Sequence, residues 1–533
     1  MNNKLPDFVK NKYVYVLILI IFCGLLYLPS TVNRDLHYRD ELRYVEIAKE
    51  MLETGQWLVP HFGGEIYSDK PPVYFWLLNF FRKIFGDYST LAMVLPSALS
   101  AIIIVLLTYY LGSIILDRRY AFIAGLILAT SFLFFGLSIF VRMDMLMIVF
   151  ITASLLSFYL GYINEGKLKE RYYLLVFLFM GLATVVKGPA GFLDPLLTIP
   201  GFLLLEGNLA ELKKMKPARG FAIFLAVVLL WIIPAVIAGG KEYAYQLLIV
   251  QTLGRSVNSF AHDRPFYYYL ITFPVTFLPW SLFLISGFIY SLKNRKKLPP
   301  EVKFLLAWFW MPFLLFSLIS GKLDIYLLPI YPAASLLTGY LFKMVIKKKA
   351  RQKYLVVPAV LTFLLLMVGG LALPETAEGV AVSSLLRPAV ITFLLAGVAG
   401  FIALFKKKYI LIPYLLVFMI FLFLLNFSLS VVPPLSQGYT KEPIANRIKV
   451  LREEENLTNI IAYRYGQPES LAVYTDFYIH DIGSEEQLIA YLKEKERVLV
   501  LMGEEDWDKL KGKLPGGTEV IYSSNDYLLV YHE

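Results

Sequence analysis

The 533-residue chain contains one cysteine, Cys23, and five histidines. A single thiol excludes an intrachain disulfide and a metal centre built from several cysteines. Charged residues make up only 17% of the chain, whereas soluble domains contain about 25%. The sequence also shows no internal repeat and no low-complexity tract longer than a loop. The scarcity of charge points to a membrane protein.

Apolar residues take the place of the missing charged residues. The chain is 58% hydrophobic with a mean hydropathy of +0.61, and apolar runs of about 20 residues recur along it, as in transmembrane helices. The first run, 13–28, follows three lysines and leads into Tyr27-Leu28-Pro29 rather than into a small-residue cleavage site. We therefore expect a retained anchor helix and not a removed signal peptide.

The apolar runs predict a multi-pass α-helical membrane protein with about thirteen transmembrane helices. The predicted spans are 13–32, 89–115, 120–139, 144–163, 172–187, 190–205, 220–239, 266–290, 303–320, 325–342, 354–373, 388–405 and 409–432.

The basic residues assign a side to each loop. If the spans alternate, all basic clusters lie on one side, which the preference of Lys and Arg for short inner loops makes cytoplasmic. The clusters are 4–12, 118–119, 167–171, 213–219, 293–303, 343–353 and 406–408. The net charge of +10 is thus a signal of topology and not of nucleic-acid binding.

The opposite, outer side receives several polar motifs that are far apart in the sequence. They are the insert 33–88, the segments 141–144 and 187–189, the loop 240–265 and the segment 321–326. With an odd number of spans, the C-terminal tail is also outside. Ionisable clusters at a membrane edge are candidates for a functional site, so we expect these motifs to converge on one face.

The composition changes near residue 437. We predict a transmembrane domain, 1–436, whose outer loop 33–88 carries interfacial helices, followed by a small outer α/β domain, 437–533. In the second domain a helix is expected at 442–454 and strands at 460–463, 498–502, 520–522 and 528–531.

Each outer polar residue has a structural alternative. Asp40 opens an amphipathic segment and either caps that helix or serves as a base. Lys70 precedes Pro71-Pro72 and either binds an anion or extends along the membrane surface. Arg142 and Asp144 either form a salt bridge at a span start or act in a site. Lys187, before a Gly-Pro pair, also fits an ordinary helix end.

Two further motifs stay equally open. His262, in the loop 240–265, is either a surface residue or a ligand. Lys322 and Tyr326 flank a span start, where tyrosines commonly form an aromatic belt. Taken one at a time, none of these residues identifies a function.

Taken together, the motifs resemble a known family. Residues 40–48 (DELRYVEIA), 55–60 (GQWLVP) and 67–72 (YSDKPP) look like the first outer loop of the GT-C glycosyltransferases. Within these enzymes they are similar to the aminoarabinose-transferase branch, which modifies lipid A and is related to the protein O-mannosyltransferases. The resemblance extends to 142–144, 187–189, 262–265 and 322–329, so it covers most of the membrane region.

The resemblance implies a GT-C fold in the bacterial inner membrane, with a cytoplasmic N-terminus and a periplasmic C-terminal domain. It implies an inverting transfer of a sugar from a polyprenyl-phosphate donor to lipid A or another periplasmic acceptor, by a monomer and without a nucleotide. An O-mannosyltransferase-like enzyme that modifies protein or polysaccharide shares every motif. A lipid or solute transporter is the alternative from another class, although transporters place ionisable residues within spans and contain repeats.

The resemblance also assigns roles to residues. Asp40 is the essential carboxylate and Asp144 the second acid. The substrate-binding set is Glu41, Arg43, Tyr44, Tyr67, Lys70, Arg142, Lys187, Arg264, Lys322 and Tyr326. A divalent metal (Zn, Mg or Mn) maps to Asp69 and His262. This chain departs from the family at Asp69, where a glutamate is usual, and two protein ligands alone would leave a metal shell to be completed by water or substrate.

Overall fold

A computed structural model describes residues 12–32, 34–36, 39–247, 249–250, 263–372, 382–454 and 456–533. The chain forms two compact units. The first comprises Met1–Val32, Ser68–Tyr74 and Val94–Val431, and the second comprises Asn33–Tyr67, Phe75–Met93 and Val432–Glu533. In this division most of the first outer loop clusters with the C-terminal segment.

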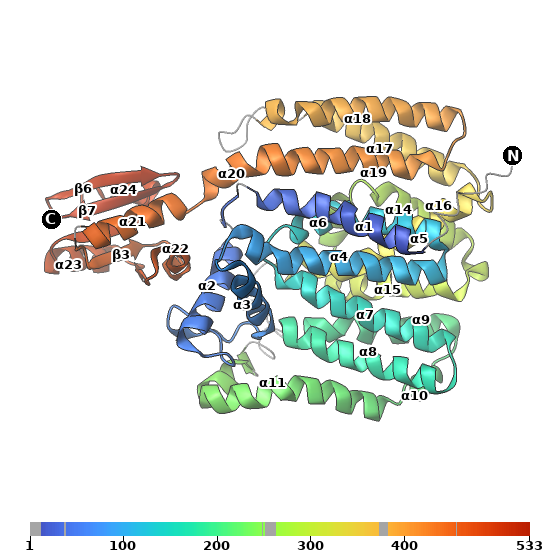
Figure 1. The fold of residues 1–533 in the computed structure, drawn as a ribbon, viewed down its shortest axis with the longest axis horizontal. Coiled ribbons are helices and arrows are strands. Elements are labelled where there is room, and N and C mark those ends of the chain that lie inside the picture. The colour runs from blue at the N-terminus through green and yellow to red at the C-terminus, as the bar shows by residue number, and fades with distance from the viewer. Residues whose placement is uncertain are drawn as a thin grey trace. The chain divides into compact units, whose positions relative to one another are not determined.

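The first unit is helical (Figure 1). Buried backbone groups in an apolar environment must be satisfied within their own segment, which explains why its long apolar runs are helices. Its helices are α1 (Lys12–Tyr27), α4 (Thr90–Ile115), α5 (Arg118–Ala129), α6 (Phe132–Ser138), α7 (Met143–Ile163), α8 (Gly166–Lys187), α9 (Ala190–Glu206), α10 (Glu211–Lys214), α11 (Pro217–Tyr245), α13 (Tyr268–Thr276), α14 (Ser281–Lys293), α15 (Pro300–Leu318), α16 (Tyr331–Ile346), α17 (Lys353–Leu371), α18 (Val382–Phe405) and α19 (Leu411–Asn426). Short helices are η2 (Leu28–Thr31), η4 (Arg295–Lys297), η5 (Asp324–Ile330) and η6 (Phe427–Val431).

Nine helices among the described residues are long and apolar enough to cross a membrane, or up to eleven if two bent pairs each count as one span. The bent pairs are α5 with α6, at 68°, and α13 with α14, at 120°. The two other expected spans, 172–187 and 190–205, are the helices α8 and α9. Of these, α8 carries charged residues at both ends and α9 has only 17 residues. The structure thus supports a multi-pass helical membrane protein.

Helices α7 and α8 pack closely against each other, and this packing determines where their polar ends lie. A Cβ at Gly161 of α7 would lie 2.5 Å from the ring of Tyr173 on α8, so the glycine permits the close approach. The ring of Phe158 stacks on the ring of the same tyrosine, with 6.1 Å between the ring centres. Because α8 returns antiparallel to α7, the first turn of α7 and the last turn of α8 lie at the same end.

The turn from α8 to α9 also depends on glycine. Gly188 ends α8 with a φ of 83°, a conformation that residues with a side chain rarely adopt, and its N–H donates to the Thr184 carbonyl at 2.7 Å. At Gly191 a Cβ would lie 2.3 Å from the backbone of Ala183. The expectation that Lys187-Gly188-Pro189 ends a helix is confirmed.

The second unit contains part of the first outer loop and the C-terminal segment. The loop forms α2 (Arg39–Thr54), a short hairpin of β1 (His61–Phe62) and β2 (Glu65–Ile66), and α3 (Val73–Phe85), most of which belongs to this unit. The expected amphipathic helix after Asp40 is therefore present as α2, with Leu42, Val45 and Met51 buried.

The C-terminal segment contains a five-stranded sheet in the order β4-β3-β5-β7-β6. The strands β3, β4 and β5 are parallel, and β7 is antiparallel to β5 and β6. The elements are α20 (Val432–Tyr439), α21 (Glu442–Glu454), β3 (Asn459–Tyr463), η7 (Pro468–Leu471), α22 (Ala472–Thr475), β4 (His480–Ile482), α23 (Glu485–Glu494), β5 (Val498–Gly503), α24 (Glu504–Leu510), β6 (Thr518–Ser524) and β7 (Tyr527–His532).

Alternation along the central strand explains the layers of this α/β fold. Val498 and Val500 of β5 face α23 and α24, whereas Leu499 and Leu501 face α21. The helix and four strands expected from the sequence are present. The short edge strand β4 was missed, because three residues carry too little alternation to be recognised.

Candidate functional site

In the second unit, Asp40 lies in the first turn of α2, beside an arginine that is flanked by two tyrosine rings. Arg43, one turn further along, forms an ion pair with the Asp40 carboxylate. The guanidinium of Arg43 lies 5.5 Å from the ring centre of Tyr44 and 5.9 Å from that of Tyr67. Because α2 begins at Arg39, Asp40 is inside the helix rather than its N-cap, at an end where the helix dipole favours acids.

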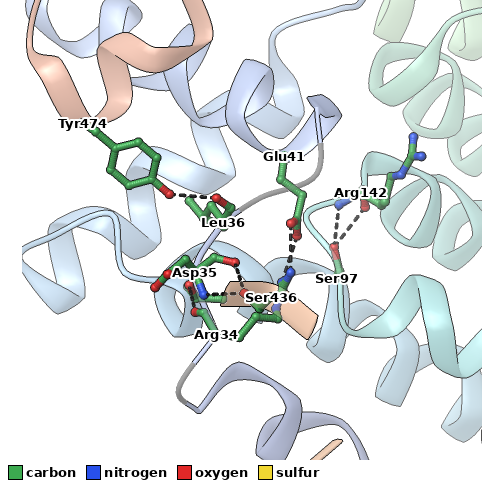
Figure 2. Close-up of polar contacts among 9 residues, drawn as sticks. Arg34, Asp35, Leu36, Glu41, Ser97, Arg142, Ser436 and Tyr474 are labelled. Atoms are coloured by element: carbon green, nitrogen blue, oxygen red, sulfur yellow. Dashed lines mark hydrogen bonds and ion pairs between the residues drawn. The ribbon is translucent and has the colours of Figure 1, made fainter. Parts of the chain in front are cut away.

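Glu41 occupies a different environment from the one expected. Its side chain is 0% exposed and accepts two hydrogen bonds from the Arg34 guanidinium, each 2.9 Å long (Figure 2). A bidentate pair of this kind fixes geometry strongly. Glu41 is thus placed to hold the chain before α2, and its role in substrate binding stays a prediction. Sequence reasoning missed Arg34, which has no local motif.

In the first unit, the central polar contact joins α7 to α8. Asp144, in the first turn of α7, forms an ion pair with Lys187, the last residue of α8. The Asp144 side chain is only 2% exposed. The Lys187 ammonium also lies 5.9 Å from the ring centre of Tyr326 in η5. Three motifs that are distant in the sequence therefore meet, as expected. A salt bridge between Arg142 and Asp144 is one of the two alternatives from the sequence, whereas the ion pair observed for Asp144 is with Lys187.

Two further cations act on the same carboxylate. Arg142 and Lys70 both add a favourable electrostatic interaction to Asp144. The backbone N–H and carbonyl of Arg142 are held by the Ser97 hydroxyl at 3.0 and 3.1 Å, while its side chain extends away from that contact (Figure 2). The Lys70 ammonium donates to the Asp69 carboxylate at 3.0 Å. The cluster thus contains three cations and two carboxylates: Lys70, Arg142, Lys187, Asp69 and Asp144. Its net charge is positive, which suits an anionic ligand.

Lys322 and Arg264 form a separate contact in the first unit. The Lys322 side chain is buried, and its ammonium donates to the carbonyls of Ile319 and Arg264, the latter at 2.9 Å. Ile319 is the C-cap of α15, so the lysine satisfies the end of that helix. Arg264 is exposed, with its guanidinium 5.9 Å from the ring centre of Tyr268. Lys322 therefore has a structural role at this helix end, and its role in substrate binding stays a prediction.

Only one of the two predicted metal ligands, Asp69, lies in the part of the chain that the structure describes. His262 lies outside the described residues, and Asp69 is occupied by its ion pair with Lys70. Within the described ranges there is no group of three or more His, Cys, Asp or Glu side chains that could hold a metal ion. A divalent metal at Asp69 and His262 therefore stays a prediction.

Known proteins resemble this chain in sequence and in fold. Residues 69–233 match the family described as dolichyl-phosphate-mannose-protein mannosyltransferase. The undecaprenyl phosphate-alpha-4-amino-4-deoxy-L-arabinose arabinosyl transferase of Aeromonas salmonicida is 33% identical over 324 residues, which is 60% of this chain and 58% of that protein. The transferase of the same description from Edwardsiella ictaluri is 31% identical over 330 residues. The chain therefore matches less than two thirds of the length of these relatives.

Solved structures show the same fold over nearly the whole chain. ArnT from Cupriavidus metallidurans, bound to undecaprenyl phosphate, has a TM-score of 0.80 at 17% identity and covers 97% of both chains. The apo oligosaccharyltransferase of Archaeoglobus fulgidus has a TM-score of 0.58 at 14% identity and covers 92% of this chain and 69% of its own. This chain therefore shares the fold of these two proteins. The resemblance inferred from the first outer loop is confirmed.

Proposed function

We propose that this chain is an inverting glycosyltransferase that moves 4-amino-4-deoxy-L-arabinose, or a sugar like it, from a polyprenyl-phosphate donor to lipid A. The observation that carries the proposal is the 33% identity to a named arabinosyl transferase over 324 residues. The fold, shared over 97% of the chain with a structure bound to undecaprenyl phosphate, supports it.

The chemistry fits the positive group around Asp144. When the bond between the anomeric carbon and the phosphate oxygen breaks, its electron pair leaves with the polyprenyl phosphate. Preorganised cations stabilise that growing negative charge where water is scarce. Lys70, Arg142 and Lys187 are the cations that surround Asp144. We assign them to the donor phosphate, with Asp144 and Tyr326 holding Lys187 in place.

The acceptor determines the role of Asp40. If the acceptor is a hydroxyl, its oxygen attacks the anomeric carbon from the face opposite the phosphate, and the Asp40 carboxylate accepts its proton. If the acceptor is a phosphate of lipid A, it is already ionised and needs no base. Asp40 then orients Arg43, with which it is paired, and the developing oxocarbenium character of the sugar tolerates the nearby negative charge.

The proposal includes a location in the bacterial inner membrane, about thirteen spans, a cytoplasmic N-terminus, a periplasmic C-terminal domain and a monomeric state. The nine to eleven candidate spans among the described residues support a multi-pass protein, and the basic loops support a cytoplasmic N-terminus. Because Cys23 is buried, a cysteine introduced at exposed Asp508 provides a label site. Labelling of Asp508→Cys in intact spheroplasts by an impermeant maleimide is expected, and labelling only after lysis contradicts the orientation.

A divalent metal on Asp69 and His262 stays a prediction from the resemblance. Metal analysis of the purified protein, together with Asp69→Ala, checks it. A stoichiometric metal that Asp69→Ala removes supports the site. A protein without metal that is fully active in the presence of a chelator contradicts it.

The function is tested with purified protein in lipid nanodiscs, lipid A and undecaprenyl-phosphate aminoarabinose. Mass spectrometry is expected to show lipid A that carries the added sugar. The match of 69–233 to a protein mannosyltransferase family favours one second candidate, a protein acceptor with a polyprenyl-phosphate hexose donor. A parallel reaction with that donor and periplasmic protein distinguishes the two. Sugar transfer in neither reaction contradicts both.

A further inference from the structure

Within the second unit, the first outer loop and the C-terminal domain are joined by a set of specific polar contacts. The Tyr474 hydroxyl donates to the Leu36 carbonyl at 2.8 Å, and the Asp35 N–H donates to the Ser436 hydroxyl at 3.1 Å (Figure 2). Both contacts hold the chain just before α2. The buried Arg34–Glu41 pair then ties this segment to the first turn of the helix.

The other end of α2 is held by Lys49. Its buried ammonium donates to the Ala472 carbonyl at 2.7 Å and to the Asp476 carboxylate at 2.6 Å. A buried lysine needs such partners because an unpaired charge away from water is costly. Further along the loop, a Cβ at Gly63 would lie 2.6 Å from the Glu469 side chain, so the hairpin turn also approaches this segment closely.

Apart from the Asp35–Ser436 hydrogen bond and the Arg34–Glu41 pair within the loop, these contacts reach one stretch of the C-terminal domain, residues 469–476, which contains α22 and lies between β3 and β4. On the helix side the spacing is informative. Nine positions separate Asp40 from Lys49, and at about 100° per residue they point to opposite sides of α2. The face held by the domain is therefore opposite to the face that carries Asp40.

We propose that the C-terminal domain is a positioning element for α2, and that Lys49 and Asp476 are positioning residues for the Asp40 carboxylate. The contacts of Lys49 and Leu36 with residues 472–476 fix the position of α2 along its axis and its rotation about that axis. The catalytic consequence rests on the proposed glycosyltransferase function, whereas the mechanical linkage does not. Neither Lys49 nor Asp476 is assigned to contact a substrate.

The chain offers a matched control. Lys449 of α21 pairs with the same Asp476 carboxylate, but entirely within the C-terminal domain. Lys49→Met and Lys449→Met therefore each remove one lysine from one carboxylate, and only the first releases α2. Tyr474→Phe, which removes a single hydroxyl, is a milder variant that tests the same linkage if Lys49→Met fails to fold. Lys49→Arg retains the charge and is the conservative variant.

Two measurements on the full chain in nanodiscs test whether the C-terminal domain positions α2. Hydrogen exchange of the α2 amides is expected to accelerate about tenfold or more in Lys49→Met, since a buried contact is lost, and to be unchanged in Lys449→Met. The kcat of Lys49→Met is expected to fall about tenfold with little change in the KM for the donor, and Lys49→Arg is expected to recover most of it.

Other outcomes overturn the inference. Unchanged exchange in both Lys49→Met and Tyr474→Phe shows that the domain does not hold the helix. Faster exchange with an unaltered kcat shows that the linkage does not position Asp40. A lower kcat with unchanged exchange assigns Lys49 to the substrate instead. If the unaltered chain transfers no sugar, the proposed function fails, and the exchange measurement still decides the linkage.

Discussion

Asp144 and Lys187 form a buried ion pair that joins the first turn of α7 to the last turn of α8. Buried pairs are sensitive to the loss of one partner, because the other charge then stays desolvated and uncompensated. The pair is thus structural as well as a candidate for catalysis, and the two roles predict different behaviour on substitution.

Removal of the lysine is expected to destabilise the protein. Lys187→Met should lower the stability by about 3 kcal/mol, the low end for a broken buried pair, because Arg142 and Lys70 still act on Asp144. Thermal unfolding in detergent measures the change. The exposed pair Lys347–Asp117 is the control, since Lys347→Met should cost at most about 1 kcal/mol. Equal effects of the two variants would show that burial does not matter here.

Asp40 is expected to matter for turnover rather than for folding. Asp40→Asn keeps the size of the side chain and removes a half-buried ion pair with Arg43, worth at most about 1 kcal/mol. If the acceptor is a hydroxyl, kcat should fall about 100-fold or more while the melting temperature hardly changes. Glu53→Gln, at an exposed position of the same helix, should leave kcat unchanged and alter the melting temperature only slightly. Full activity of Asp40→Asn would remove Asp40 from the catalytic assignment.

Local patterns made part of this site predictable. The amphipathic period after Asp40, the basic residue before Gly188 and the apolar run of β5 are encoded within short windows, and each corresponds to an observed element. The pairing of Asp144 with Lys187 was not predictable, because it depends on how α7 and α8 pack. Sequence spacing favoured Arg142, which is only two residues from Asp144.

Roles that depend on burial also could not be predicted from the sequence. Glu41 and Lys322 carry charges at expected positions, yet one binds Arg34 and the other satisfies a helix end. Lys49 drew no attention because it lies on the polar side of an amphipathic helix. Its partners, Ala472 and Asp476, are more than 400 residues away in the chain. A single sequence contains no signal for such pairs.

The turn after Lys187 is expected to tolerate no side chain at Gly191. In Gly191→Ala the new Cβ would meet the backbone of Ala183, which cannot rotate away as a side chain would. A cost of about 1–3 kcal/mol is expected, as for other overpacked sites. Gly136→Ala is the control, because a Cβ there meets nothing within 4 Å. Thermal unfolding of both variants measures this, and an unchanged melting temperature for Gly191→Ala would contradict the close approach of α8 and α9.

Glu46 predicts a dependence of stability on pH. Burial is the main cause that raises the pKa of this α2 carboxyl from 4.5 to about 8. Repulsion by Glu50 and Glu53 also raises the pKa, whereas attraction by Lys49 and a hydrogen bond from Tyr478 lower it. The folded state therefore keeps a proton that the unfolded state releases, so stability falls as pH rises from 4.5 to about 8.

Glu46→Gln imitates the protonated form and removes this titration. Its melting temperature should match that of the unaltered protein at about pH 4 and exceed it increasingly up to about pH 9, where the unaltered protein carries a buried charge. Thermal unfolding across that range measures the difference between the two curves. Glu53→Gln, on the exposed side of α2, should show a smaller and flatter difference. Parallel curves for Glu46→Gln and the unaltered protein would mean that Glu46 ionises normally in the folded state, and that this part of α2 is open to water.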